Sequence, residues 1–251
     1  MPMNKNRIVY IATAISLFIT CGLQAQLYTG IEAGLYKNYL ITNNAAQSST
    51  NYNSALGVGV GLPILYQFTK WFALEADPNY TQKNYKITRT GFYRGIYQNN
   101  TNAYIQLPIL ANFSFGGTRV RGFMNMGLYG AYWISAKVKG VEPNILNLID
   151  TAVNSTTILN ENNGYSYNEK YQFDNIKDNR LEMGWLAGVG ISYILKSASR
   201  LFVEARYTSS LTDQQKQYQT NQTPRYNDNY GISLGCLFRL DNKLVPPKIN
   251  K

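Results

Sequence analysis

Apolar and polar residues alternate along most of the chain. The last such segment shows the pattern clearly, because Ile232 and Leu234 alternate with Ser233. Successive side chains of a β-strand point to opposite faces, so this alternation predicts strands with one apolar face and one small or polar face. We identify eight such segments, at residues 27–39, 54–68, 71–86, 102–115, 119–137, 179–195, 201–210 and 229–240.

Long polar loops and very short turns connect these segments in strict alternation. The turn Thr69-Lys70 is one of the short connections, whereas the third long loop runs over residues 138–178. An even-numbered barrel with both termini in the periplasm produces this alternation, while a soluble β-sandwich or a lipocalin-like barrel gives no reason for it. We therefore predict an all-β fold, an eight-stranded antiparallel up-and-down transmembrane β-barrel in the outer membrane, with its long loops extracellular.

Aromatic residues gather near both ends of the predicted strands, as they do in the two girdles of a membrane barrel. We expect one girdle around the short turns, formed by Tyr66, Phe68, Trp71, Phe72, Phe113, Phe115, Tyr193 and Phe202. We expect the second girdle toward the long loops, formed by Tyr39, Tyr80, Tyr104, Tyr132, Trp133 and Tyr230.

The amino-terminal residues indicate export. Lys5 and Arg7 precede an apolar stretch at residues 8–19, and Ala25 is a small residue suited to cleavage. The stretch is shorter than the roughly 20 apolar residues of a membrane helix and is typical of a signal peptide. Cys21 is an alternative site for a lipid anchor, although residues 18–20 match a lipobox poorly. We predict a signal peptide at residues 1–25, the barrel at 26–240 and a periplasmic tail at 241–251.

The mature chain is basic. Without Lys5 and Arg7 the number of basic residues falls from 24 to 22 against 14 acidic ones, which leaves a formal charge of +8. This charge suits anionic partners, either nucleic acid or the phosphate-rich leaflet of an outer membrane. Because the chain is exported, we expect outer-membrane lipid and lipopolysaccharide as partners, and no nucleic acid. Cys236 is the one cysteine of the mature chain, so no disulfide can form within it.

Several segments resemble one known family. Residues 104–110 read YIQLPIL, residues 127–132 read GLYGAY, residues 184–193 read GWLAGVGISY and residues 204–207 read EARY. Together they resemble the PorT-like outer-membrane β-barrel proteins of Bacteroidetes, which are small eight-stranded barrels of the OmpA-like class. The resemblance covers nearly the whole mature chain and implies architecture rather than activity. The chain departs from the common pattern at its end, where residues 241–251 follow the last strand.

The sequence offers little for catalysis. It contains no histidine, so Ser-His and Cys-His nucleophile pairs and imidazole metal sites cannot form. Carboxylate pairs such as Glu75 with Asp77 leave a hydrolase chemically possible. Both signs of charge occur on the inward faces, however, and a narrow barrel is filled by its own side chains. We therefore expect no cofactor and no metal, and an ion-pair network in a closed lumen, formed by Glu32, Glu75, Asp77, Arg121, Glu182, Glu204, Arg206 and Arg239.

Basic residues alternate with aromatic ones after the third segment. Charge-assisted contacts from these residues could hold lipopolysaccharide phosphates, while an ordinary solvated loop is the alternative. The candidate contacts are Lys83, Lys86, Arg89 and Arg94. Residues 150–152 also match an Asp-Thr-aliphatic O-glycosylation motif of Bacteroidetes.

The sequence thus predicts a non-enzymatic outer-membrane barrel with a structural or surface-interaction role and a filled lumen. The family resemblance implies an alternative, an accessory component of the type IX secretion system that contacts other envelope proteins. A small-solute porin and a carboxylate-dependent lipid or peptide hydrolase are weaker alternatives.

Overall fold

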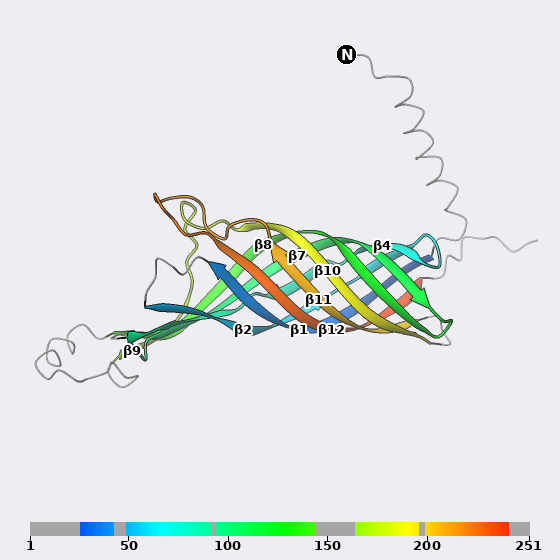
Figure 1. Ribbon diagram of the computed structural model, residues 1–251, viewed down its shortest axis with the longest axis horizontal. Coiled ribbons are helices and arrows are strands. Elements are labelled where there is room, and N and C mark those ends of the chain that lie inside the picture. The colour runs from blue at the N-terminus through cyan, green and yellow to red at the C-terminus, as the bar shows by residue number, and fades with distance from the viewer. Residues whose placement is uncertain (1–25, 43–48, 92–93, 144–163, 196–198, 241–251) are drawn as a thin grey trace, which may run out of the picture.

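The computed structural model describes residues 26–42, 49–91, 94–143, 164–195 and 199–240. In Figure 1 the strands wind around a common axis and enclose a barrel. The predicted signal peptide, the predicted tail and the possible glycosylation motif lie outside the described residues. Among the described residues, no helix is long and apolar enough to cross a bilayer.

The described ranges contain twelve strands, and all of their pairings are antiparallel. Their bounds are β1 Gln26–Thr42, β2 Thr50–Gly61, β3 Ile64–Gln67, β4 Phe72–Ala76, β5 Asn79–Gln82, β6 Tyr85–Arg89, β7 Tyr97–Gly116, β8 Val120–Pro143, β9 Gly164–Lys170, β10 Leu181–Ile194, β11 Arg200–Ser210 and β12 Arg225–Leu240.

These strands form a closed ring with eight positions around it. We call each position, whether one strand or several strands in line, a wall. β2 and β3 together make the second wall, β4 to β6 the third, and β9 and β10 the sixth, because the members of each set pair with the same neighbouring wall. β12 pairs with β1 and closes the ring. The predicted all-β, antiparallel barrel is confirmed, although twelve strands make up the eight walls where the sequence predicted eight unbroken strands.

Two prolines divide walls that the sequence predicted as single strands. Pro63 lies between β2 and β3, and Pro78 lies between β4 and β5. Proline has no backbone N–H to donate, so the regular ladder stops at these positions. The neighbouring walls remain joined, because the carbonyl of Pro63 accepts from Gly30 N at 2.9 Å and that of Pro78 accepts from Leu62 N at 3.0 Å.

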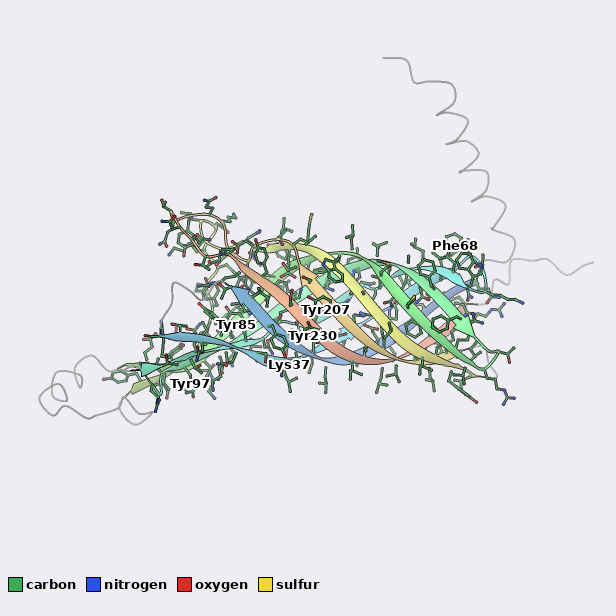
Figure 2. All side chains as sticks on the ribbon, viewed as in Figure 1. Lys37, Phe68, Tyr85, Tyr97, Tyr207 and Tyr230 are labelled. Carbon is green, nitrogen blue, oxygen red and sulfur yellow. The ribbon has the colours of Figure 1, made fainter. Side chains whose placement is uncertain are left out.

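The two faces of the ring have opposite environments. Leu56 and Leu128 point outward and are 69% and 67% exposed, whereas Leu110 and Leu186 point inward and are fully buried. Side chains project from the whole outer surface in Figure 2. An outer face with this many exposed apolar side chains suits a hydrocarbon solvent and not water. The predicted assignment of outward and inward positions is therefore confirmed along most of the walls.

One predicted girdle is visible at the end of the barrel that holds Gln26 and Leu240, which we call the terminal end. There the rings of Tyr66, Phe68 and Phe72 follow one another at centroid distances of 4.8 and 5.7 Å. The Trp71 ring lies 6.3 Å from that of Phe113 on the neighbouring wall. Phe202, which we expected in this girdle, is instead buried inside the barrel because its position on β11 is an inward one.

Several strands run further than predicted at the opposite end, which we call the loop end. β7 begins at Tyr97, β8 continues to Pro143, and β9 lies within the predicted third loop. Figure 1 shows β2 and β9 reaching well beyond the end of β11. We call this projecting sheet the strand extension; it comprises residues 50–54, 85–89, 97–101, 137–143 and 164–170.

Candidate functional site

An apolar layer fills the lumen near the terminal end. It combines side chains from six walls, and the rings of Phe123 and Phe202 meet edge to face with centroids 6.1 Å apart. Large aromatic side chains that meet inside a barrel this narrow exclude water from its lumen. The layer consists of Tyr28, Leu65, Ala73, Phe123, Phe202 and Leu237.

A charged layer centred on Arg206 lies deeper in the lumen. The guanidinium of Arg206 contacts three carboxylates, Asp77 at 2.8 Å, Glu204 at 2.9 Å and Glu32 at 3.2 Å. All four side chains are buried, and they come from β1, β11 and the residue after β4. A guanidinium has five N–H donors, which allows one cation to join several walls.

Carboxyl groups outnumber guanidinium groups in this layer. Glu75 is also buried there and accepts a hydrogen bond from Asn112 Nδ2 at 3.1 Å. Asn125 Nδ2 donates to Glu204 Oε1 at 3.2 Å. Three carboxyl groups therefore share the guanidinium of Arg206, and Glu75 is held by Asn112, so Arg206 is the cation on which the layer depends.

Glycines on the neighbouring walls make room for these side chains. A Cβ on Gly188 would lie 2.2 Å from Glu204 Oε1, and a Cβ on Gly61 would lie 2.7 Å from Asp77 Oδ1. Real Cβ atoms do not approach other atoms this closely, so any side chain here would displace the carboxylates. The inward glycines are thus part of the charged layer.

Lys83 lies inside the barrel, and its predicted place among the lipopolysaccharide contacts is wrong. It is fully buried and forms an ion pair with Glu182. Its ammonium lies 4.8 Å from the ring centroid of Tyr129 and 5.1 Å from that of Tyr104. Glu182 also accepts from the Tyr129 hydroxyl at 2.8 Å and from Asn227 Nδ2 at 2.9 Å.

The alternation of the third wall explains this position. Glu75, Asp77 and Thr81 are all buried at odd positions, and Lys83 continues the series. The sequence prediction grouped Lys83 with the basic residues that follow it and did not extend the inward face far enough. The period of two was the signal that could have placed it.

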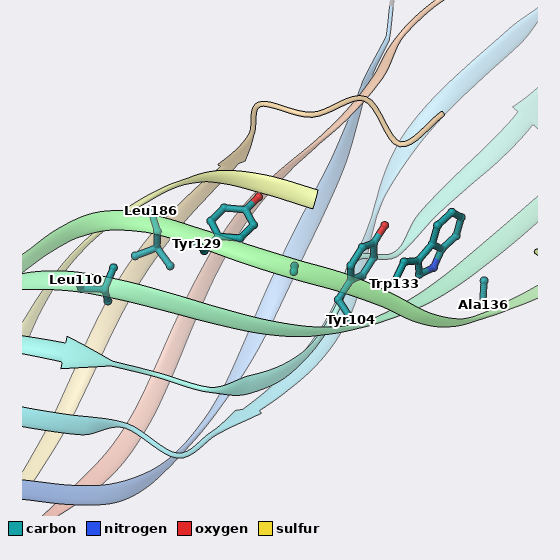
Figure 3. Packing of buried hydrophobic residues seen from close by; sticks show 7 residues of the cluster. Tyr104, Leu110, Tyr129, Trp133, Ala136 and Leu186 are labelled. Carbon is teal, nitrogen blue, oxygen red and sulfur yellow. The ribbon is translucent and has the colours of Figure 1, made fainter. Parts of the chain in front are cut away.

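Aromatic side chains cover the lumen at the loop end. The ring of Tyr104 stacks on that of Trp133 at 5.9 Å, and Tyr171 and Phe173 pack on Trp133 at 6.0 and 4.9 Å. Gln214 Nε2 donates to the Tyr104 hydroxyl at 3.1 Å. Figure 3 shows Tyr104 and Trp133 adjacent, beyond Tyr129 and Leu186 in the same cluster.

This cover corrects one prediction. Tyr104 and Trp133 were expected in the outer girdle, but both are buried inside. Alternation explains both positions, because Tyr104 continues the inward series of Gln106 and Leu110, and Trp133 continues that of Tyr129 and Ala131. Residues 171–173 lie in a loop, as predicted, and the side chains of Tyr171 and Phe173 close the mouth.

The two remaining members of the predicted network lie nearer the terminal end. Arg121 is half-buried and donates to the carbonyls of Lys70 and Ser114, at 2.6 and 3.1 Å. Arg239 is exposed near the end of β12, where it pairs with Tyr28 of β1. The structure thus brings Glu32, Glu75, Asp77, Glu204 and Arg206 together, puts Glu182 with Lys83, and leaves Arg121 and Arg239 outside both groups.

The other predicted lipopolysaccharide contacts lie on or beside the strand extension. Lys86 is half-buried, with its ammonium 4.7 Å from the Tyr97 ring centroid. Arg89 is exposed and its guanidinium donates to the Thr50 hydroxyl, and Arg94 is exposed. A hollow of about 530 Å³ opens beside them, lined by Ser49, Ile87, Arg89, Ile96, Tyr97, Gln98, Val141, Glu142 and Tyr167.

The basic side chains of the strand extension can bind an anion, whereas the described residues form no metal centre. Over the residues that the structure describes, no three His, Cys, Asp or Glu side chains are grouped as metal ligands. The buried carboxylates face cations or amides of the chain itself. At the loop end, basic side chains that a partner could reach lie beside an open hollow.

Residues 21–216 match the family described as outer membrane protein beta-barrel domain. The chain belongs to this family. The outward apolar face of the ring is therefore the face that meets the lipid of an outer membrane. A search of curated proteins found no match.

The chain is also similar, at low identity, to several solved structures. Neisserial surface protein A is 12% identical, with a TM-score of 0.43, over 86% of this chain and 99% of that one. OprG from Pseudomonas aeruginosa is 12% identical, with a TM-score of 0.43, over 86% of this chain and 95% of that one. The outer membrane protease OmpT from Escherichia coli is 10% identical, with a TM-score of 0.41, over 86% of this chain and 96% of that one.

Proposed function

We propose that this outer membrane β-barrel is a non-enzymatic protein with a filled lumen, which binds an anionic partner at its loop end. The observation that carries the proposal is the difference, along the barrel axis, between a filled lumen and an accessible, basic strand extension. The apolar layer, the two charged groups and the aromatic cover occupy the lumen, whereas the strand extension presents basic side chains beside an open hollow.

Two observations support a role without catalysis. The chain has no histidine to activate a nucleophile. Its buried carboxylates are held by Arg206, Lys83 and Asn112, so they lack the access to substrate and water that hydrolysis requires. A carboxylate-dependent hydrolase is therefore a weaker candidate, even though a protease shares the general fold.

The chemistry of the extension favours phosphate groups of lipopolysaccharide. Arg89 borders the hollow, and Lys137 and Lys139 are exposed on β8 of the same sheet. Guanidinium groups bind phosphates through charge-assisted hydrogen bonds, and tyrosines suit the headgroup region of a bilayer. This proposal places the loop end at the outer leaflet and the termini in the periplasm.

The test is equilibrium binding of labelled lipopolysaccharide to the full chain in detergent. Replacing Arg89 and Arg94 together by Gln should weaken binding roughly tenfold and should reduce its dependence on salt. The matched control is Lys216→Gln, an exposed lysine in the connection between β11 and β12. Unchanged affinity of the double variant would overturn the strand extension as the surface that binds lipopolysaccharide. A large, steady conductance in planar bilayers would instead support a porin.

The alternative role, an accessory component of type IX secretion, depends on the family resemblance alone. A pull-down from membranes after mild crosslinking distinguishes it. Recovery of secretion-system subunits with the wild-type chain would favour this alternative, and their absence would favour the surface-binding role.

A further inference from the structure

A row of aromatic side chains crosses the outer face of four walls near the loop end. The ring of Tyr230 on β12 lies 4.7 Å from that of Tyr207 on β11 and 5.7 Å from that of Tyr39 on β1. Trp185 on β10 lies 5.1 Å from Tyr207. We call Tyr39, Tyr207, Tyr230 and Trp185 the aromatic shelf, and all four point away from the lumen.

A lysine lies directly beside the aromatic shelf. Lys37 is exposed, pairs with Tyr230 in the ladder and has its ammonium 5.5 Å from the Tyr39 ring centroid. It is the one cation at the outward positions of β1, β10, β11 and β12, all of which are described. Figure 2 shows Lys37 close to Tyr207 and Tyr230 on the barrel wall.

The cation of Lys37 has no neutralising partner among the described residues. Within the described residues no carboxylate lies within ion-pairing distance of its ammonium. Asp228 is the acidic residue at this level, and one of its oxygens accepts from the Tyr207 hydroxyl at 3.0 Å. A charged lysine on a lipid-facing surface is stabilised when it reaches an anionic headgroup.

The position of Lys37 along the barrel is that of a headgroup. Strands rise about 3.3 Å per residue and tilt by roughly 40°, so the ten residue steps from Leu27 to Lys37 span about 25 Å along the axis. The apolar band of a membrane barrel is also about 25 Å tall. Lys37 therefore lies at the boundary between acyl chains and headgroups.

The wall below the aromatic shelf is hollowed. The outward residues Ala33 and Ala205 are small, whereas Leu35, Ile232 and Leu234 beside them are large and exposed. These residues belong to a shallow apolar groove that extends around seven of the eight walls, and Lys37, Tyr207 and Tyr230 are among the residues that line it. An apolar surface beside a cation suits an acyl chain that carries a phosphate at its head.

We propose that Lys37, the aromatic shelf and this groove bind one molecule of lipopolysaccharide. A headgroup phosphate contacts the Lys37 ammonium, and an acyl chain lies over Ala33 and Ala205. This site deepens the proposed function and rests on it for the orientation, since the loop end must face the outer leaflet. It uses the lipid-facing wall and none of the residues of the strand extension.

The test is binding of labelled lipopolysaccharide, and in parallel of phosphatidylglycerol, to the full chain in detergent. Lys37→Gln removes the cation and should weaken lipopolysaccharide binding roughly tenfold. Ala205→Leu keeps every charge but fills the groove, and it should weaken binding several-fold. The controls are Lys216→Gln and Ala111→Leu, the latter an outward alanine on β7 that is not part of the groove. Heat-modifiable migration on gels confirms that each variant is folded.

Two outcomes would overturn the site. If Lys37→Gln binds lipopolysaccharide within twofold of wild type, the Lys37 ammonium is not part of the site. Equal weakening for phosphatidylglycerol would show a general preference for anionic lipid and not lipopolysaccharide. Loss of binding in the Arg89 and Arg94 double variant alone would reject this site and leave the proposed function standing. Loss of binding in Lys37→Gln alone would reject the strand extension as the binding surface and leave this site standing.

Discussion

β7 and β8 each run through two environments, and the comparison shows what burial in this protein depends on. Within the ring, inward residues such as Tyr104, Leu110 and Asn112 are buried by the walls opposite. In the strand extension burial is only partial, since Val141 is buried but Gln98 and Lys139 remain half-buried and exposed. The ring therefore supplies stability, and the extension supplies accessible polar surface.

The sharpest test of this comparison is Arg206→Met in the ring. It should lower the free energy of unfolding by about 3–5 kcal/mol, because Glu32, Asp77 and Glu204 would stay buried without their cation. Urea unfolding in lipid vesicles measures the change. Lys137→Met in the extension is the control and should shift stability by less than about 0.5 kcal/mol. Equal effects of the two variants would mean that the buried charged layer contributes no more to the free energy of unfolding than an exposed lysine does.

The outer face of the ring gives the next largest effect. Leu234→Arg puts a charge among lipid-facing residues and should cost about 2–4 kcal/mol if the position is near the bilayer midplane. Ile41→Arg, at an outward position near the loop end of β1, should cost no more than about 1 kcal/mol. The same urea titration compares them. A soluble, monomeric Leu234→Arg protein without detergent would contradict the membrane assignment of this face.

Lys83 and Lys86 are three residues apart, but Lys83 lies inside the ring and Lys86 lies on the strand extension. Lys83→Met should cost about 1–3 kcal/mol, less than the loss of Arg206, because Glu182 keeps the Tyr129 and Asn227 donors. Lys86→Met should be nearly neutral. Labelling with a water-soluble amine reagent checks the placement directly. Modification of Lys86 with protection of Lys83 is expected, and rapid modification of Lys83 would restore its predicted place at the surface.

The smallest effect is expected within the extension itself. Tyr167→Phe removes the hydrogen bond from the Tyr167 hydroxyl to Gln98 Oε1 at 3.2 Å and should change global stability by less than about 0.5 kcal/mol. It should nevertheless speed hydrogen exchange of the β9 amides, since segments with few buried contacts open locally. Exchange of the β11 amides serves as the internal control. Equal acceleration in both strands would show that extension and ring unfold as one unit.

Sequence reasoning was accurate where a property depends on alternation alone. The period of two identified the eight walls and the outward positions of Leu56, Leu128 and Leu234. It also identified the inward carboxylates Glu32 and Glu204 as lumen groups. It failed at the loop end, where polar, tyrosine-rich residues at 97–101 and 164–170 were interpreted as loops but pair as strands.

The amino-acid sequence by itself determined that the chain forms antiparallel strands with one apolar face, because the direction of a side chain in a strand depends only on its position along that strand. The tertiary structure decided which residues meet across the lumen. Lys83 and Glu182 are far apart in the chain, and their contact depends on ring closure and on the register of each pair of walls. One register shift, opposite Ala103 and Tyr104, changes the inward residues of β8 from odd to even positions beyond Trp133, and no local pattern records it.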